Sequence, residues 1–553
     1  ERSSIMTLKS KKLNSSTIQR IIVAFCLFAV CVGTQQIQTV KWDTGIIEFS
    51  RDSFGVLMAL ILFTHYKWSD FVRYKLPYLI WTGLGLTVGT AVTCYAVSKR
   101  FSFLFADTII IALGVFLMGY CIIHTIISFF IEKKRPKLYM PLFIIWTVMM
   151  ILMIFSRSEY LWPECYFVLF LCYYLTDRTQ EQRRNVTLGI IDGIILGFIV
   201  IQAHSLLFRP YDAVRYMGNF CNPNNNAVFL CFCLAAIFSK ILFLKKEKAK
   251  KLIIIFYFLL AEACYGFIFM TISRSGYLTT FLITVVFLIL YCRTVSKKVF
   301  FRMGILLTSL FIVIMPLTYL AVRYIPTIHP HVLFYYQEGY SEARVHSWDP
   351  RDSEKFISFE EMIQAALGRF KETGTNYNQF FGLQKSDPEI LVTRSVSASP
   401  ILPREVLMRS AAILSAQHTP ILNGEEVGNA FLVRYTIYKW YIDHLSLRGM
   451  PYDEQGFQLT EGYWVQSAHD IYLDYGINFG IPVMILFTVF IWYGIGRLIY
   501  NSCKQINVTK MSCLLITLVP PIFGLFEFAW GSGMLYTIAF YLCFSEMLLG
   551  KDN

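Results

Sequence analysis

Long runs of apolar residues, separated by short polar stretches, cover most of this 553-residue sequence. Several runs approach or exceed the roughly 20 residues that a helix needs to cross a bilayer. The pattern predicts an all-α polytopic membrane protein with about 14 spans (12–14). The expected spans lie near 18–33, 53–66, 76–97, 102–131, 138–156, 159–176, 187–208, 224–244, 251–272, 276–292, 301–321, 471–499, 511–528 and 532–549.

One long polar segment, 322–470, interrupts this alternation and divides the chain into three parts. We expect a first bundle of about 11 spans over 1–321, a loop domain over 322–470 and about three spans over 471–553. A loop of this length in a compact protein is usually functional or disordered. Because the segment is not of low complexity, we expect it to be mainly helical, with helices over 356–370, 404–415 and 429–448.

The stretch 429–448 is the clearest of these helices, with an apolar face at helical spacing. That face comprises Phe431, Tyr435, Tyr438, Ile442 and Leu445. Arg434 flanks it, and Arg448 lies two heptads further on at nearly the same azimuth. The alternative is a cap whose charged face is simply solvated.

Composition and charge support the membrane class and orient the chain. Hydrophobic residues make up 56% of the sequence and charged residues 16%, with a mean hydropathy of +0.51, whereas a soluble domain has about 45–50% and about 25%. The net charge of +13 comes mostly from short basic clusters between apolar runs, so we expect no nucleic-acid partner. The positive-inside rule then places both termini in the cytoplasm and segment 322–470 outside it.

Two short arginine motifs fall on the predicted external side. Arg215 precedes a turn with Asn222, Pro223 and Asn224 just before an apolar run. Asparagines there can cap the following helix, and a helix start with a nearby arginine favours an anion. Arg274 lies between two serines in a tight turn between two spans, where an interface anchor is the structural alternative.

A third motif combines His469 with Asp470 at the start of an apolar run. A lone histidine at a helix start is more often structural than catalytic. We favour a functional role because all three motifs project from the same predicted side. Asp470 could orient His469, but adjacent residues on a helix do not face each other, so we expect it to cap the helix that begins near Ile471.

Together these motifs resemble the O-antigen ligase and O-antigen polymerase superfamily of bacterial envelope glycosyltransferases, over roughly residues 187–500. The matching elements are an Arg-x-x-Gly turn with Asn-Pro-Asn (Arg215 to Asn224), a Ser-Arg-Ser turn (Ser273 to Ser275), an arginine-bearing loop helix (Arg434 to Tyr438) and a His-x-x-Tyr-Leu stretch (His469 to Leu473). Two departures stand out. Asp470 occupies a position where the family usually has asparagine, and the Gly-x-Gly after the loop helix is loosened to Gly449 and Gly456.

The resemblance implies transfer of a glycan from an undecaprenyl-diphosphate carrier to an acceptor glycan hydroxyl outside the cytoplasmic (inner) membrane of a bacterium. Arg215, Arg274 and Arg434 would bind the diphosphate, because bidentate arginine contacts compensate its charge. Neutral His469, with an ordinary pKa of about 6.5, would take the acceptor proton, and the reaction would invert the anomeric carbon. We expect no metal and no cofactor. Candidate supporting residues are Asn222, Asn224, Asp470, Tyr472 and Arg448.

Other functions remain open at this stage. Within the family, the residues do not decide between polymerising repeat units, which we favour slightly, and ligating a finished chain. A lipid-linked oligosaccharide flippase would share the spans and the basic pocket, but it does not need the long loop. A peptidoglycan polymerase of the shape-and-division type would typically rely on a loop aspartate rather than His469. A flippase and a chain-length regulator of the same pathway are candidate partners, besides the lipid bilayer.

Four acidic residues lie inside the apolar runs, namely Asp107, Asp192, Glu262 and Glu527. Carboxylates at such positions often mark transport paths. Their scatter over four spans does not define a proton relay, so we expect them to be paired structurally within the bundle.

Overall fold

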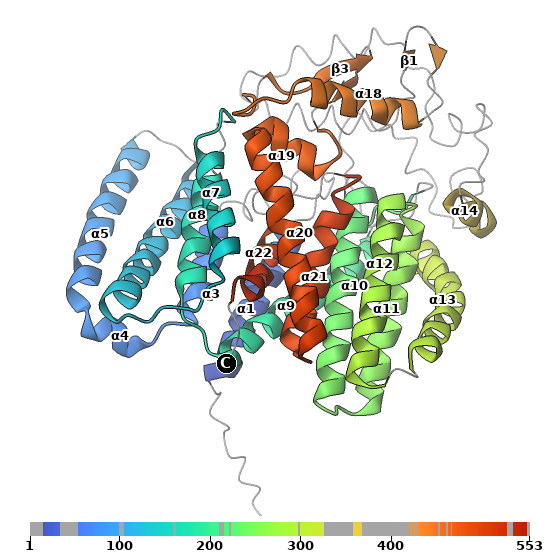
Figure 1. Cartoon of the computed structure of the whole chain (residues 1–553), viewed down its shortest axis with the longest axis horizontal. Coiled ribbons are helices and arrows are strands. Elements are labelled where there is room, and N and C mark those ends of the chain that lie inside the picture. The colour runs from blue at the N-terminus through green and yellow to red at the C-terminus, as the bar shows by residue number, and fades with distance from the viewer. Residues whose placement is uncertain are drawn as a thin grey trace, which may run out of the picture.

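A computed structural model describes residues 15–33, 53–98, 104–158, 162–208, 215–220, 223–296, 299–325, 358–367, 421–422, 425–426, 430–451, 454–460, 463–465, 467–527 and 535–549. Its helices stand side by side in a bundle, and a smaller layer with α18 and β3 lies across one end (Figure 1). The helices before that layer are α1 (Ser15–Gly33), α3 (Phe54–Phe63), α4 (Trp68–Arg73), α5 (Lys75–Ser98), α6 (Leu104–Ile126), the π-helix η1 (Ile127–Ile131), α7 (Met140–Ile154), α8 (Trp162–Leu175), α9 (Gln180–Phe208), α10 (Pro223–Lys246), α11 (Lys251–Met270), α12 (Arg274–Thr294), α13 (Val299–Tyr324) and α14 (Phe359–Ala366). Those that follow are α18 (Ala430–Asp443), α19 (Ile471–Phe479), α20 (Ile481–Lys504), α21 (Val508–Phe523) and α22 (Leu535–Leu548).

Within the described residues, eight helical segments are long and apolar enough to cross a membrane. They are α1, the segment Ile109–Ile131, α9, α10, α11, α12, α13 and α20. Four more helices, α3, α7, α21 and α22, are apolar but shorter. The protein is therefore an all-α, multi-pass membrane protein, while the count of about 14 spans stays a prediction.

Helix α1 packs closely along α9 because glycines on α9 carry no side chain at the contact. Gly189, Gly193 and Gly197 recur every four residues on one side of α9. A side chain at Gly189 would come within 2.7 Å of Val23 Cβ, and one at Gly193 within 2.5 Å of the Ala24 carbonyl oxygen. Lipid tails are as apolar as leucine, so close van der Waals contact, rather than water exclusion, holds such helix pairs together.

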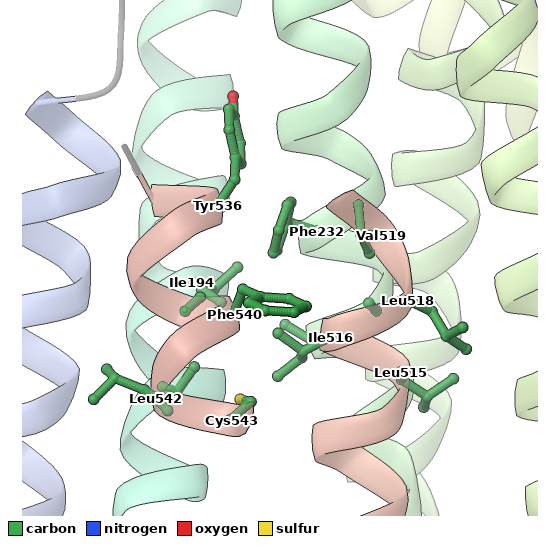
Figure 2. Close-up of a cluster of buried hydrophobic side chains, with 14 of the residues drawn as sticks. Ile194, Phe232, Leu515, Ile516, Leu518, Val519, Tyr536, Phe540, Leu542 and Cys543 are labelled. Carbon is green, nitrogen blue, oxygen red and sulfur yellow. The ribbon is translucent and has the colours of Figure 1, made fainter. Parts of the chain in front are cut away.

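Helix α10 forms the centre of the bundle, with every residue from Asn226 to Phe243 buried. Figure 2 shows the packing around Phe232 of α10, where side chains of α9, α21 and α22 meet. The Phe232 ring stacks on Tyr536 with centroids 5.1 Å apart. This packing brings the start of α10 next to the end of α21, and Asn224 and Glu527 of the site described below lie there.

The expected span over 471–499 is broken, which corrects the prediction of one helix there. Gly480 has φ +100° and separates the short helix α19 from α20. The loop after α18 crosses the chain at this break, where Ile481 N–H donates to Ser446 O (2.9 Å) and Met450 N–H donates to Ile477 O (2.8 Å). The backbone at the break is thus hydrogen-bonded to the loop after α18.

The predicted apolar face of the loop helix is wrong in part, since Tyr438 of that face does pack against a buried cluster. Helix α18 ends at Asp443, and Tyr435 and Ile442 of the expected apolar face are more than half exposed. The buried residues are instead Ile437 and Tyr441. They pack in a small cluster with Val465, Ala468 and Ile477.

The described residues between α13 and α19 include strands as well as the helices α14 and α18. The strands form two antiparallel hairpins, β1 (Ile421–Leu422) with β2 (Glu425–Glu426) and β3 (Phe457–Thr460) with β4 (Tyr463–Val465). Helix α14 lies inside the predicted helix 356–370 and begins with a capping box made by Ser358 and Glu361. The predicted helix 404–415 lies outside the described residues.

The pairing predicted for the intramembrane carboxylates holds for two of the four residues. Asp192 forms ion pairs with Arg20 and Lys240, and the partners of Glu527 are described below. Glu262 is buried, and neither of its oxygens has a hydrogen-bond partner among the described residues, so the prediction is wrong there. The side chain of Asp107 lies outside the described part of the structure.

Candidate functional site

The carboxylate of Glu527 joins side chains from three distant parts of the chain. Its Oε2 lies 3.2 Å from Nδ1 of His469. Its Oε1 accepts hydrogen bonds from Arg434 Nη2 (3.0 Å) and Asn224 Nδ2 (2.7 Å). Asn224 in turn accepts a hydrogen bond from Arg215 Nη2 (2.6 Å) through Oδ1. We call these five residues the Glu527 network.

The turn carrying Arg215 docks on the turn that precedes α12. Arg215 Nε donates to Thr271 O, and Tyr216 N–H donates to Met270 O, both at 2.9 Å. Because α12 begins at Arg274, this docking brings the two arginine motifs to adjoining turns. The side chain of Arg274 is exposed and has no hydrogen bond or ion pair within the described residues.

A buried aspartate and a helix cap hold the backbone around His469. Asp474 accepts hydrogen bonds from Ala468 N–H (2.8 Å) and Ser467 Oγ (3.0 Å), and Ser467 Oγ accepts one from His469 N–H (3.1 Å). Asp470 accepts from the N–H groups of Tyr472 and Leu473, so the predicted cap of the helix beginning at Ile471 is confirmed.

The end of α21 anchors the start of α19. Ile471 N–H donates to the carbonyl of Gly524 (2.8 Å), three residues before Glu527. This bond ties the chain positions of His469 and Glu527 to each other through the backbone as well as through their side chains. The relative placement of the two residues therefore does not depend on one side-chain contact.

Two residues at or beside the site have a strained backbone conformation. Among the described residues, four residues other than glycine have positive φ: Lys133, Lys248, Ile272 and His469. His469 has φ +52°, and Ile272, with φ +49°, lies between Thr271 and the α12 cap Ser273. A β-branched residue rarely adopts this conformation. Such strain persists only where the surrounding contacts enforce it, and it clusters at functional sites.

The electrostatic surroundings of His469 favour its protonated form. Burial lowers the pKa of the His469 imidazole, but the hydrogen bond and charge of Glu527, aided by Asp474, outweigh burial and raise it above its ordinary value. Arg434 opposes this rise through its positive charge. Burial also raises the pKa of Asp474 to about 7, against the effect of its hydrogen bonds.

Not every predicted site residue joins the Glu527 network. Tyr472 donates to Pro521 O (3.3 Å) instead. Arg448 lies beyond the end of α18, not on its predicted azimuth, and donates to Phe155 O (3.1 Å), so the structure does not place it in the network. Asn222 lies outside the described residues.

The central place of Glu527 was not predicted from the sequence. Only structural pairing was expected for this carboxylate, whose side chain is 11% exposed. One feature of the sequence does point to Glu527 as a functional residue. It is an ionisable residue between two phenylalanines in an apolar run, on the same predicted side as the three motifs. Its partners come from residues 224, 434 and 469, and nothing in the local sequence identifies them.

Fold and site together define a multi-pass, all-α membrane protein with a charged network at one end of its bundle. No protein-family model matches the sequence, and no curated protein is significantly similar to it.

Proposed function

We propose that the protein is a membrane glycosyltransferase that transfers a glycan from an undecaprenyl-diphosphate-linked donor to an acceptor glycan hydroxyl, most simply to polymerise the repeat units of a surface polysaccharide. The observation that carries the proposal is the Glu527 network. Three of the residues singled out from separate sequence motifs, Arg215, Arg434 and His469, belong to this one hydrogen-bonded group. A purely structural role for each motif would not require them to meet.

The arginines supply what a diphosphate leaving group needs, which is charge compensation rather than a strong acid. The side chain of Arg434 is 42% exposed although it contacts Glu527, so a ligand can reach this side chain. Arg274 is exposed on the adjoining turn. Guanidinium groups bind phosphate oxygens in a bidentate manner, and fixed positive groups stabilise the charge that develops as the bond to phosphate breaks.

His469 supplies a base for the acceptor. A sugar hydroxyl is a weak nucleophile, and a base within hydrogen-bond reach of it accelerates attack by about 10²–10⁴-fold. The side chain of His469 is 40% exposed, so an acceptor can reach it. Attack opposite the departing diphosphate would invert the anomeric carbon, and no metal or cofactor is required in this scheme.

The charge pattern of α10 supports an external site, with both termini in the cytoplasm. Asn224 lies in the first turn of α10, whereas Lys245 and Lys246 lie in its last turn. By the positive-inside rule, the lysine end faces the cytoplasm and the Glu527 network faces outward. The proposed location is the cytoplasmic membrane of a bacterium, alongside a flippase that delivers the donor and a chain-length regulator.

The test is transfer by purified full-length protein supplied with an undecaprenyl-diphosphate-linked repeat unit. Wild type should produce a ladder of longer glycans, and His469→Ala should lose it. His444→Ala is the matched control, because His444 is exposed just after α18 and does not belong to the Glu527 network.

The alternatives give different results in the same assay. Transfer of one finished chain to a separate lipid acceptor, without a ladder, would indicate a ligase. Movement of the donor across vesicle membranes without glycan growth would indicate a flippase. Full activity of His469→Ala would contradict the assignment of the base.

A further inference from the structure

We propose that Glu527 is the positioning residue of the reaction: it holds the proton of His469 on Nδ1 and thereby makes Nε2 the nitrogen that takes the proton of the acceptor hydroxyl. This inference rests on the proposed function and adds to it a residue and an atomic assignment.

The assignment of the proton follows from hydrogen-bond chemistry. A neutral imidazole carries one N–H and one lone pair, whereas an ionised carboxylate can only accept. Nδ1 of His469 lies 3.2 Å from Oε2 of Glu527, so in the neutral ring Nδ1 is the donor. The lone pair is then on Nε2, the nitrogen that points away from Glu527 around the ring.

The carboxylate is itself held in place by two other donors. Asn224 and Arg434 both donate to Oε1, which leaves Oε2 for His469. The contact with Arg434 is also an ion pair, so a positive charge lies next to the carboxylate. Glu527 is buried, so these partners replace the water that would otherwise solvate it.

Charged groups around His469 come from three further elements. Glu527 approaches from the end of α21, Arg434 from α18 and Asp474 from α19, with Asp470 next to His469 in the chain. The two carboxylates Glu527 and Asp474 stabilise the imidazolium form, and Arg434 opposes them. The base therefore gains strength mainly from Glu527, which is in direct contact with the ring.

The chemical step balances with these groups. The acceptor oxygen forms a bond to the anomeric carbon as the bond from that carbon to the diphosphate oxygen breaks, and the diphosphate leaves with the bonding electrons. The acceptor proton moves to Nε2, giving an imidazolium whose charge Glu527 compensates across Nδ1. The proton then passes from Nε2 to water, which restores the neutral ring.

The experiment measures His469 directly, without turnover. Full-length wild type and Glu527→Gln are treated with diethyl pyrocarbonate, which acylates neutral imidazole, and modification of His469 is followed by mass spectrometry across pH. Removing the charge of Glu527 should lower the apparent pKa of His469 by at least about one pH unit. The acid limb of glycan transfer should move to lower pH by the same amount, and the maximal rate should fall by about 10²-fold or more.

Glu546→Gln is the matched control. Glu546 is also a buried carboxylate with an arginine partner, Arg183 at 3.3 Å, but it does not belong to the Glu527 network. It should leave the titration of His469 unchanged. Glu527→Asp should retain the charge and restore part of the titration shift, which loss of structure alone would not produce.

A second variant keeps the proposal testable if Glu527→Gln does not fold. Arg434→Gln removes the opposing positive charge, and the side chain is 42% exposed, so the fold should tolerate the change. The apparent pKa of His469 should rise in this variant. An unchanged titration in folded Glu527→Gln, or a fall in Arg434→Gln, would overturn the role of Glu527. The expected titration shifts in a protein that never extends a glycan would instead overturn the proposed function and leave the contact between Glu527 and His469 intact.

Discussion

Replacing Gly480 with alanine is expected to destabilise the crossing that connects the α18 layer to the membrane bundle. Gly480 has φ +100° and ψ 161°, a region that is open almost only to glycine. An added Cβ would lie 2.3 Å from the carbonyl oxygen of Leu447. That carbonyl cannot simply withdraw, because the hydrogen bonds of Ile481 to Ser446 and of Met450 to Ile477 secure the crossing on both sides.

The expected loss of stability in Gly480→Ala is the sum of two separate effects. Holding alanine in this backbone conformation costs about 1–3 kcal/mol. Relieving a clash of the added carbon with fixed backbone costs about another 1–3 kcal/mol. We therefore expect a loss of about 2–6 kcal/mol in the stability of this region.

Gly496→Ala provides the matched control in the same helix. Nothing lies within 4 Å of a Cβ placed at Gly496, which is exposed on α20. Alanine in a helix interior is favoured over glycine by about 0.5–1 kcal/mol, so this variant should be neutral or slightly stabilised.

The assay is heating in detergent with a thiol-reactive fluorophore, which reports exposure of buried cysteines such as Cys231 and Cys513. Membrane proteins commonly unfold irreversibly, so the variants are compared by apparent Tm at one scan rate. Gly480→Ala should unfold at a clearly lower temperature than wild type, and Gly496→Ala should not. Equal apparent Tm values for the two variants would refute the argument from backbone conformation and contact.

Four further predictions concern the candidate site. Because the pKa of His469 is raised and the base must be neutral, transfer should increase with pH through a midpoint above 6.5, and a midpoint at or below 6.5 in the pH–rate profile would contradict this. Asp470→Ala should destabilise the start of α19 by about 0.5–2 kcal/mol, measured by apparent Tm, whereas Asp470→Asn should keep the cap and most of the stability. Arg215→Ala and Arg274→Ala should each lose more transfer activity than the corresponding lysine variants, because lysine keeps the charge but not the bidentate geometry; equal losses would refute diphosphate binding by that residue. Chelator should leave the rate unchanged, and strict dependence on an added divalent metal would contradict the proposed scheme.

The membrane class and the helix positions could be read from the sequence. Apolar runs of bilayer length have few alternatives to a helix, because every backbone polar group must be satisfied inside the lipid. The cap at Asp470 was also predictable, since a cap involves only the next few residues. The break at Gly480 was not predictable, because glycine is common in membrane helices. The loop at Ser446 that contacts the break is also distant from it in the sequence.

The buried face of α18 could not be predicted from the sequence either. Its sequence offers apolar residues all round, so periodicity selected the side of Tyr435 and Ile442, while the structure buries Ile437 and Tyr441. Which side is buried depends on what the helix packs against, here Val465, and not on the helix itself.

The same distinction holds for the candidate site. The sequence by itself determined that this is a helical membrane protein and that Arg215, Arg434 and His469 are candidate functional residues, because local composition and charge carry that information. Only the tertiary structure decided that they belong to one network and that Glu527 lies at its centre. The physical reason is that a buried carboxylate takes whichever donors the packing of α10, α18 and α21 brings within hydrogen-bond reach, and that packing depends on the whole chain.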